Sequence, residues 1–256
     1  MPDSRDQVQW FIEWTYSPTD FFEQPRLIRH KHCDLAIEEG KVKAKIDLTF
    51  GDPRLTLRSE LDTYLNNLFI GAQLESHKQF ELLPSSVCRE RPGGGRDIFV
   101  EVSELVMVAD IHADLEVTDK DGRVIADSRA ERIKRTESLA DLAAKHGGTD
   151  ETARKILQSY HNASKDQSNL FVHLYEIRDA LKTRFAGEAE ARRALKIPKA
   201  NWSALGRLSN TEPLKQGRHR GEKSELRNAK TEEVDEGMAA ARMMIENYLK
   251  YLDGTL

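Results

Sequence analysis

The residues best suited to do chemistry form a short basic stretch between Lys215 and Lys223. It holds four lysines or arginines against one glutamate, and Gly217 and Gly221 bracket its central Arg-His-Arg. Glycine lets the backbone come close to a partner, and arginine offers a fork of donors to phosphate oxygens. A histidine can move a proton at cellular pH. The stretch therefore predicts a phosphate-binding segment.

Five residues of the basic stretch, together with Arg207 before it, have specific roles on this interpretation. His219 is the candidate acid or base, and Arg218 is the second candidate catalytic residue. The candidate phosphate ligands are Arg207, Lys215, Arg220 and Lys223. Residues 216–230 include few large apolar side chains, so we expect an exposed loop there. A basic surface loop before a capped helix has the same composition, and this alternative stays open.

Two other groups of residues have the spacing of metal ligands. His30 and His32 lie two apart in a basic segment and would chelate a metal or contact phosphate if they share a strand face. Asp110, His112 and Asp114 alternate in a strand-like run and would project to one side. A solvated sheet edge and a polar outer face give the same patterns. We predict no metal site and no cofactor.

Several common kinds of active site have no counterpart in the sequence. The run of three glycines at 93–95 lacks the GxxxxGK[ST] pattern of a phosphate loop and predicts a hairpin connection. No GxSxG motif indicates a serine hydrolase. Cys33 and Cys88 have no CxxC spacing, which is typical of a reducing compartment and gives no zinc site.

Size and charge set the limits on the class of protein. The chain has 256 residues, of which 39% are hydrophobic, enough to fill a core. Its formal net charge of -4 does not indicate a nucleic-acid binder as a whole, so such a function would depend on a local basic patch. We find no signal peptide and no apolar run long enough to cross a membrane, and expect a cytoplasmic protein without membrane contact.

The first half of the chain predicts an antiparallel sheet with a helix on one face. Strands are expected over 7–15, 33–38, 42–48, 78–90 and 97–109, with a further hairpin over 111–118 and 123–130. Apolar residues that recur every three to four positions predict a helix over 55–70, with Gly71 near its end.

The second half predicts helices only. One begins near Leu139 and ends before Gly147-Gly148, and another begins at Thr149. Further helices are expected over 168–186, 188–196 and 200–210, and a long amphipathic helix begins at Thr231. We therefore expect an α+β fold, with an α+β domain over 1–147 and a helical domain over 148–256.

The C-terminal half resembles the HEPN superfamily, whose helical domains occur in RNA-cutting toxins, phage-defence proteins and non-catalytic partners of nucleotidyltransferases. The shared arrangement is several helices, then a basic segment with a histidine, here residues 218–221, then a variable loop and a terminal helix over about 231–252. The resemblance covers about residues 150–256. It implies a domain that acts on RNA in bacterial stress or phage defence and pairs into a homodimer.

Active HEPN domains carry an arginine, four to six intervening residues and then a histidine. The resemblance implies cleavage without metal, in which the ribose 2′-hydroxyl attacks the adjacent phosphate. Counting back from His219, the places of that arginine hold Glu212, Pro213 and Leu214, which departs from the family pattern.

Literal matches to the HEPN spacing lie elsewhere, from Arg26 to His32 and from Arg154 to His161. Chance alone predicts about two such matches in a chain of this composition. Arg154 and His161 would nevertheless lie on one helix face, so they form a secondary candidate pair.

Three hypotheses follow. The first is an RNA-directed protein of HEPN type, either a metal-independent ribonuclease or a degenerate RNA binder, that forms a homodimer. The second is a non-catalytic interaction module that assembles through its helical half and recognises a protein partner with its N-terminal sheet. The third is a metal-dependent enzyme that uses the histidines or the Asp-His-Asp run of the first half.

Overall fold

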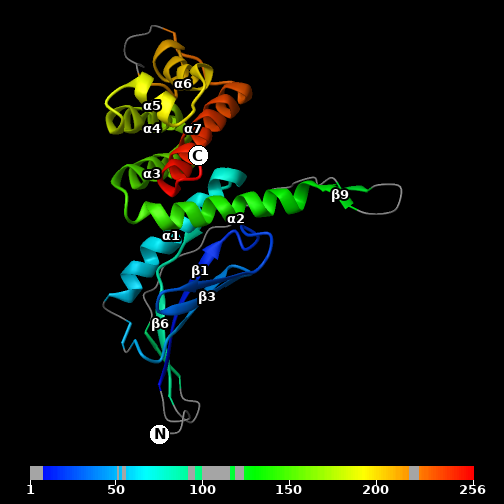
Figure 1. Cartoon of the computed structure of the whole chain (residues 1–256), viewed down its shortest axis with the longest axis vertical. Helices are drawn as coiled ribbons and strands as arrows, with labels where there is room; N and C mark the ends of the chain where they lie inside the picture. Colours follow the sequence, from blue (N-terminus) through cyan, green and yellow to red (C-terminus); the bar gives the residue numbers. More distant parts are fainter. Residues whose placement is uncertain are drawn as a thin grey trace. The chain divides into compact units, whose positions relative to one another are not determined.

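The computed structural model describes residues 8–50, 52–53, 56–91, 96–99, 116–118, 124–218 and 225–256. Two compact units emerge from it. The sheet unit is Met1–Leu65 with Phe80–Ile133, and the helical unit is Asn66–Gln79 with Lys134–Leu256. The expected α+β fold, an antiparallel sheet followed by helices, is confirmed (Figure 1).

The sheet unit is built on an antiparallel sheet. Its described strands are β1 (Gln9–Ser17), β2 (Arg26–His30), β3 (Cys33–Glu38), β4 (Lys41–Ile46), β5 (Glu81–Leu82), β6 (Ser86–Glu90) and β7 (Arg96–Phe99). They follow the order β2-β3-β4-β1-β6-β7, and β5 pairs with β1. The expected single strand over 78–90 is wrong, because Pro84 lacks the N–H that a continuous ladder needs between β5 and β6.

One face of this sheet carries the core of the sheet unit. In β4 every second residue is buried, as the alternation in the sequence predicts. Helix α1 (Leu57–Ser76) begins against this face, because the indole nitrogen of Trp14 donates to Asp62 Oδ1 at 2.7 Å. Each large apolar side chain buried here contributes about 1.5 to 3 kcal/mol. The buried strand residues of this face include Ile12, Trp14, Leu35, Ile37, Val42, Ala44 and Ile46.

Helix α1 does not end near Gly71, so that expectation is wrong. The helix continues to Ser76 because Gly71 serves a packing contact instead of a helix end. A Cβ on Gly71 would lie 2.5 Å from the carbonyl oxygen of Leu139 and 2.6 Å from Ala140 Cα. Only glycine lets the two helix backbones approach this closely.

Helix α2 (Ser128–Gly147) begins earlier than the sequence pattern suggests. Strand β8 (Glu116–Thr118) pairs with β9 (Val124–Asp127), and the expected strand over 123–130 stops where α2 starts. Asp127 explains the boundary, because its carboxylate accepts the Ala130 N–H at 3.0 Å and so caps the first turn. The expected strand over 97–109 reaches beyond β7 into residues that the structure does not describe.

The helical unit continues with five further α-helices in its described part. They are α3 (Glu151–Lys165), α4 (Leu170–Arg184), α5 (Glu188–Ala194), α6 (Lys199–Gly206) and α7 (Thr231–Asp253), coloured green to red in Figure 1. The expected helix over 200–210 changes at Arg207 into a π-helical turn, Arg207–Thr211. No described helix is both long and apolar enough to span a bilayer.

The core of the helical unit forms where α3, α4 and α7 pack together. Tyr160, Phe171 and Tyr248 are fully buried. Gly237 of α7 lets the helix approach α4, since a Cβ there would lie 2.8 Å from the Phe171 ring. These helices give a rigid base for the segment that precedes α7.

Candidate functional site

The basic stretch begins on a base that is tied to the helices. The N–H of Arg218 donates to the carbonyl of Ser209 at 2.8 Å, and the N–H of Phe171 donates to the carbonyl of Gln216 at 3.2 Å. Gly217 is close-packed here, because a Cβ would lie 3.0 Å from the Ser209 carbonyl. Residues 215–218 are therefore held against the π-helical turn and the start of α4.

The segment after the basic stretch is tied to the segment before it. Arg227 donates its N–H to Pro213 O at 2.9 Å and accepts the Lys215 N–H at the same distance. These backbone bonds join residues 213–215 to Arg227 in what we call the closed base. His219, Arg220 and Lys223 lie outside the described residues.

Arg218 has a defined position on this base. Its guanidinium carbon lies 4.3 Å from the centroid of the Tyr175 ring, which is a cation–π contact. Its Nη1 is 3.8 Å from Asp179 Oδ2, at the edge of ion-pair range, and the two side chains are 39% and 51% exposed. Arg218 is thus oriented while much of its charge remains open to solvent.

A second guanidinium shares the Tyr175 ring. The guanidinium carbon of Arg178 lies 5.3 Å from the centroid of that ring and 5.4 Å from the centroid of the buried Trp202 ring. Arg178 also forms an ion pair with Glu188 at 3.2 Å. Tyr175, Arg178 and Asp179 share one face of α4 because they lie three and four residues apart. Together with Arg218 they form what we call the tyrosine cluster: Tyr175, Arg178, Asp179 and Arg218.

Arg207 has a different environment from Arg218. Glu236 and Glu212 both bond its guanidinium and raise its pKa. Arg227 likewise bonds both oxygens of Glu233 at 2.6 Å and reaches Glu212 at 3.3 Å. These side chains form what we call the clamp: Arg207, Glu212, Arg227, Glu233 and Glu236. The charge of Arg207 is therefore already compensated within the protein.

The secondary pair, Arg154 and His161, does not form a joint site among the described residues. Arg154 is exposed on α3, whereas His161 is 7% exposed and its Nδ1 lies 2.9 Å from the Gln73 side-chain oxygen. Burial lowers the pKa of His161 to about 4. His161 therefore sits in the core as a neutral, hydrogen-bonded side chain.

Tyr175, Arg178 and Asp179 did not follow from sequence reasoning. They lie in the expected helix 168–186, far along the chain from the basic stretch, and no motif connects the two segments. Lys215, in contrast, was a candidate phosphate ligand from the sequence; it is exposed and carries no ion pair with a described residue. The contact between Arg218 and Tyr175 of α4 is visible only in the folded structure.

The histidines of the first half lie in dissimilar surroundings. The His30 ring packs edge-on against Tyr64 at 5.0 Å, and its burial lowers its pKa. His32 packs on Phe50 at 4.7 Å. No group of three metal-ligand side chains occurs among the described residues, and Asp110, His112 and Asp114 lie outside them. Both cysteines are buried free thiols.

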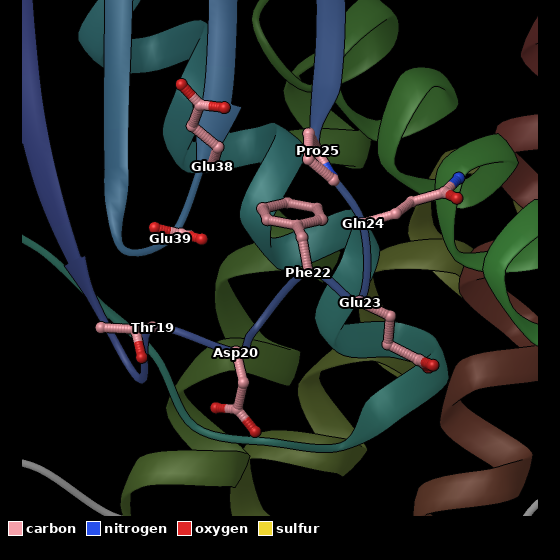
Figure 2. Close-up of a pocket in the computed structure, with 8 residues that line it drawn as sticks. All are labelled: Thr19, Asp20, Phe22, Glu23, Gln24, Pro25, Glu38 and Glu39. Atoms are coloured by element: carbon pink, nitrogen blue, oxygen red, sulfur yellow. The ribbon is translucent and has the colours of Figure 1, made fainter.

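The sheet unit has a cavity of about 560 Å³ between residues 19–25 and the turn after β3. Figure 2 shows the Phe22 ring in the middle of the lining, with Glu38 and Glu39 on one side. Asp20 adds a third carboxyl group, and the carboxylate of Glu23 is already paired with Arg129 and Arg132. A lining with this charge repels phosphate, so the cavity is not a second phosphate site.

Comparison of the chain with protein-family models, with curated proteins and with solved structures finds no match. The choice between the possible functions therefore depends on the geometry of the basic stretch and the tyrosine cluster.

Proposed function

We propose that the helical unit is a HEPN-type RNA-binding module that holds the RNA backbone through phosphate groups. The observation that carries the proposal is the position of Arg218, which is stacked on Tyr175 and still 39% exposed on its side chain. A guanidinium held in this way loses little freedom on binding and can bond two phosphate oxygens at once.

The contrast with the clamp supports this choice of residues. Arg207 and Arg227 are each bonded by two carboxyl groups, whereas Arg218 has one carboxylate at 3.8 Å and Lys215 has no ion pair among the described side chains. A phosphate can therefore bind Arg218 and Lys215 more easily than Arg207 and Arg227, because fewer carboxylates compete for them. Arg218 and Lys215 are therefore the proposed contacts, and Arg220 and Lys223 extend the same stretch.

His219 gives the proposal its catalytic form. It follows Arg218 directly in the sequence, and a histidine beside a bound phosphate can accept the proton of a ribose 2′-hydroxyl or donate one to the leaving oxygen. We propose His219 in this role for a metal-independent ribonuclease. In the non-catalytic form of the proposal, the HEPN-type module binds RNA without proton transfer by His219 and without cleavage. Either form is proposed to act as a homodimer in stress response or phage defence.

RNA binding by the purified protein tests the proposal. Fluorescence anisotropy with a labelled RNA of about 20 nucleotides, longer than a typical single-strand site, should show binding that weakens as salt increases. Arg218→Ala should reduce the affinity several-fold. The matched control is Lys155→Ala, which removes the same charge from an i,i+4 pair on α3.

Cleavage is tested separately on the same RNA. His219→Ala should abolish any cleavage and leave the thermal midpoint unchanged, and a chelator should have no effect. A wild-type protein that neither binds nor cleaves RNA would overturn the proposal and favour the non-catalytic interaction module.

A further inference from the structure

The junction between α5 and α6 carries a second concentration of positive charge. Four cations lie within eight residues: Arg192, Arg193, Lys196 and Lys199. Arg193, Lys196 and Lys199 are exposed, and Arg192 is partly buried. None of the four makes an ion pair with a described residue, in contrast to Arg178 and Arg207 in the same unit.

The nearest carboxyl group in the sequence does not compensate this charge. Glu190 folds back over Gly187 at the start of α5, where its carboxylate occupies the space that a Cβ on Gly187 would need. The Glu190 side chain therefore points toward the start of α5 and away from the junction at its end. From α7, the Asn247 amide donates to Leu195 O at 2.8 Å and carries no charge.

Helix stability does not explain the placement of these cations. Arg192 and Arg193 lie in the last turn of α5, where positive charge is favourable. Lys199, however, lies in the first turn of α6, where a carboxylate would be favoured and no acidic residue occurs. Pro198 supplies no side-chain cap to this turn.

Lys196 also occupies a backbone position at the end of α5 that glycine would adopt more easily. Its φ of +49° lies in the left-handed region, and the Ile197 N–H closes the end of α5 on Arg192 O at 2.9 Å. Glycine normally holds this place at a helix end. Two local rules are thus broken by lysines at one junction, and such departures concentrate at functional sites.

The junction connects to the basic stretch through α6. At the far end of α6 the guanidinium of Arg178 lies against Gly206 and leaves no room for a Cβ. Arg178 in turn shares the Tyr175 ring with Arg218. Helix α6, which has eight residues and spans about 12 Å, therefore links the junction to the tyrosine cluster.

We propose that Arg192, Arg193, Lys196 and Lys199 form a second phosphate-binding surface, which takes the same RNA as the basic stretch a few nucleotides further along. The inference rests on the proposed function and adds the path of the RNA: from the basic stretch, past the tyrosine cluster, to the α5–α6 junction. RNA long enough to reach both surfaces then binds more tightly than RNA that reaches one.

The salt dependence of RNA affinity tests this surface. A triple variant, Arg193→Ala, Lys196→Gly and Lys199→Ala, keeps the backbone preference at 196 and removes three cations. For single-stranded RNA the slope of log affinity against log salt should fall in magnitude by about 2, because each phosphate contact contributes about 0.7. The control removes three exposed lysines elsewhere in the helical unit: Lys134, Lys155 and Lys165.

RNA length gives a second measurement. An RNA of about 20 nucleotides should lose affinity in the triple variant, whereas one of about 4 nucleotides, the smallest common site size, should bind the triple variant and the wild type alike. We expect that affinity no longer depends on RNA length in the triple variant. Arg218→Ala should still reduce affinity by the same factor in that background.

One substitution separates binding from folding. Lys199→Glu places a carboxylate in the first turn of α6, so the thermal midpoint should be unchanged or raised, while affinity for the longer RNA should fall at least tenfold. Wild-type binding that depends on Arg218 but is insensitive to both junction variants would overturn the second surface and leave the proposed function in place. A wild type without RNA affinity would overturn both.

Discussion

The guanidinium of Arg218 lies 4.3 Å from the centroid of the Tyr175 ring, and this contact joins the basic stretch to α4. The ring orients the charge without neutralising it. Asp179, at 3.8 Å, is too distant and too exposed to do so. The residue next to His219 therefore has a fixed direction before any ligand arrives.

Removal of the Tyr175 ring tests this orientation. Tyr175→Ala should weaken RNA binding by about fivefold, because an exposed cation–π contact is worth about 1 kcal/mol. Tyr175→Phe keeps the ring and should bind as the wild type does. Anisotropy titrations measure both, and equal affinities for the Ala and Phe variants would exclude an orienting role.

Gly71 should tolerate no larger residue. Gly71→Ala is expected to destabilise the protein by about 1 to 3 kcal/mol, because the new methyl group meets the backbone of α2. Urea unfolding measures the change. The control is Ser59→Ala on the exposed side of the same helix, which should change the stability by less than about 0.5 kcal/mol.

The clamp should stabilise the start of α7. Glu233 accepts the Lys230 N–H at 2.9 Å, and its pKa is lowered to about 2 by Arg227 and by this bond. Glu233→Gln keeps the shape and removes the charge, so we expect a loss of about 1 kcal/mol in the free energy of unfolding. Glu232→Gln, an exposed neighbour in the same turn, is the control. Equal losses in the two variants would contradict the clamp.

Acid should destabilise the helical unit through His161. Its pKa is lowered to about 4 in the folded protein, below the usual 6.5, so the unfolded chain binds more protons between these values. The free energy of unfolding should therefore decrease as pH falls from about 6.5 to about 4, by up to about 3 kcal/mol. His161→Gln can still bond Gln73 and should flatten this dependence. Parallel pH curves for the two proteins would rule out His161 as the cause.

Much of the fold follows from the sequence for local reasons. Alternating burial in β4 depends on neighbouring residues alone, and so does the start of α3, where the Asp150 side chain accepts the Ala153 N–H close to the expected start at Thr149. The prediction at Gly71 was wrong because the sequence alone does not show whether a glycine ends a helix or lets a second helix pack closely against it. That choice is made by Leu139 and Ala140, which lie far along the chain.

The candidate site was less accessible to sequence reasoning. The composition around Arg218 indicated phosphate chemistry, but it could not distinguish Arg218 from Arg207. The difference depends on which carboxyl groups the fold brings near each guanidinium: Glu212 and Glu236 reach Arg207, and Asp179 alone approaches Arg218 among the described acids. Such pairings are tertiary and leave no local pattern.

The closed base of the basic stretch has a consequence for how the protein can vary. The backbone of Arg227 is bonded to Pro213 and Lys215, and its side chain is bonded to Glu233 of α7, so one residue joins the two segments. A substitution at Arg227 would therefore act on residues 213–215 and on the start of α7 together. Variation at this one position is constrained by two segments that are separate in the sequence.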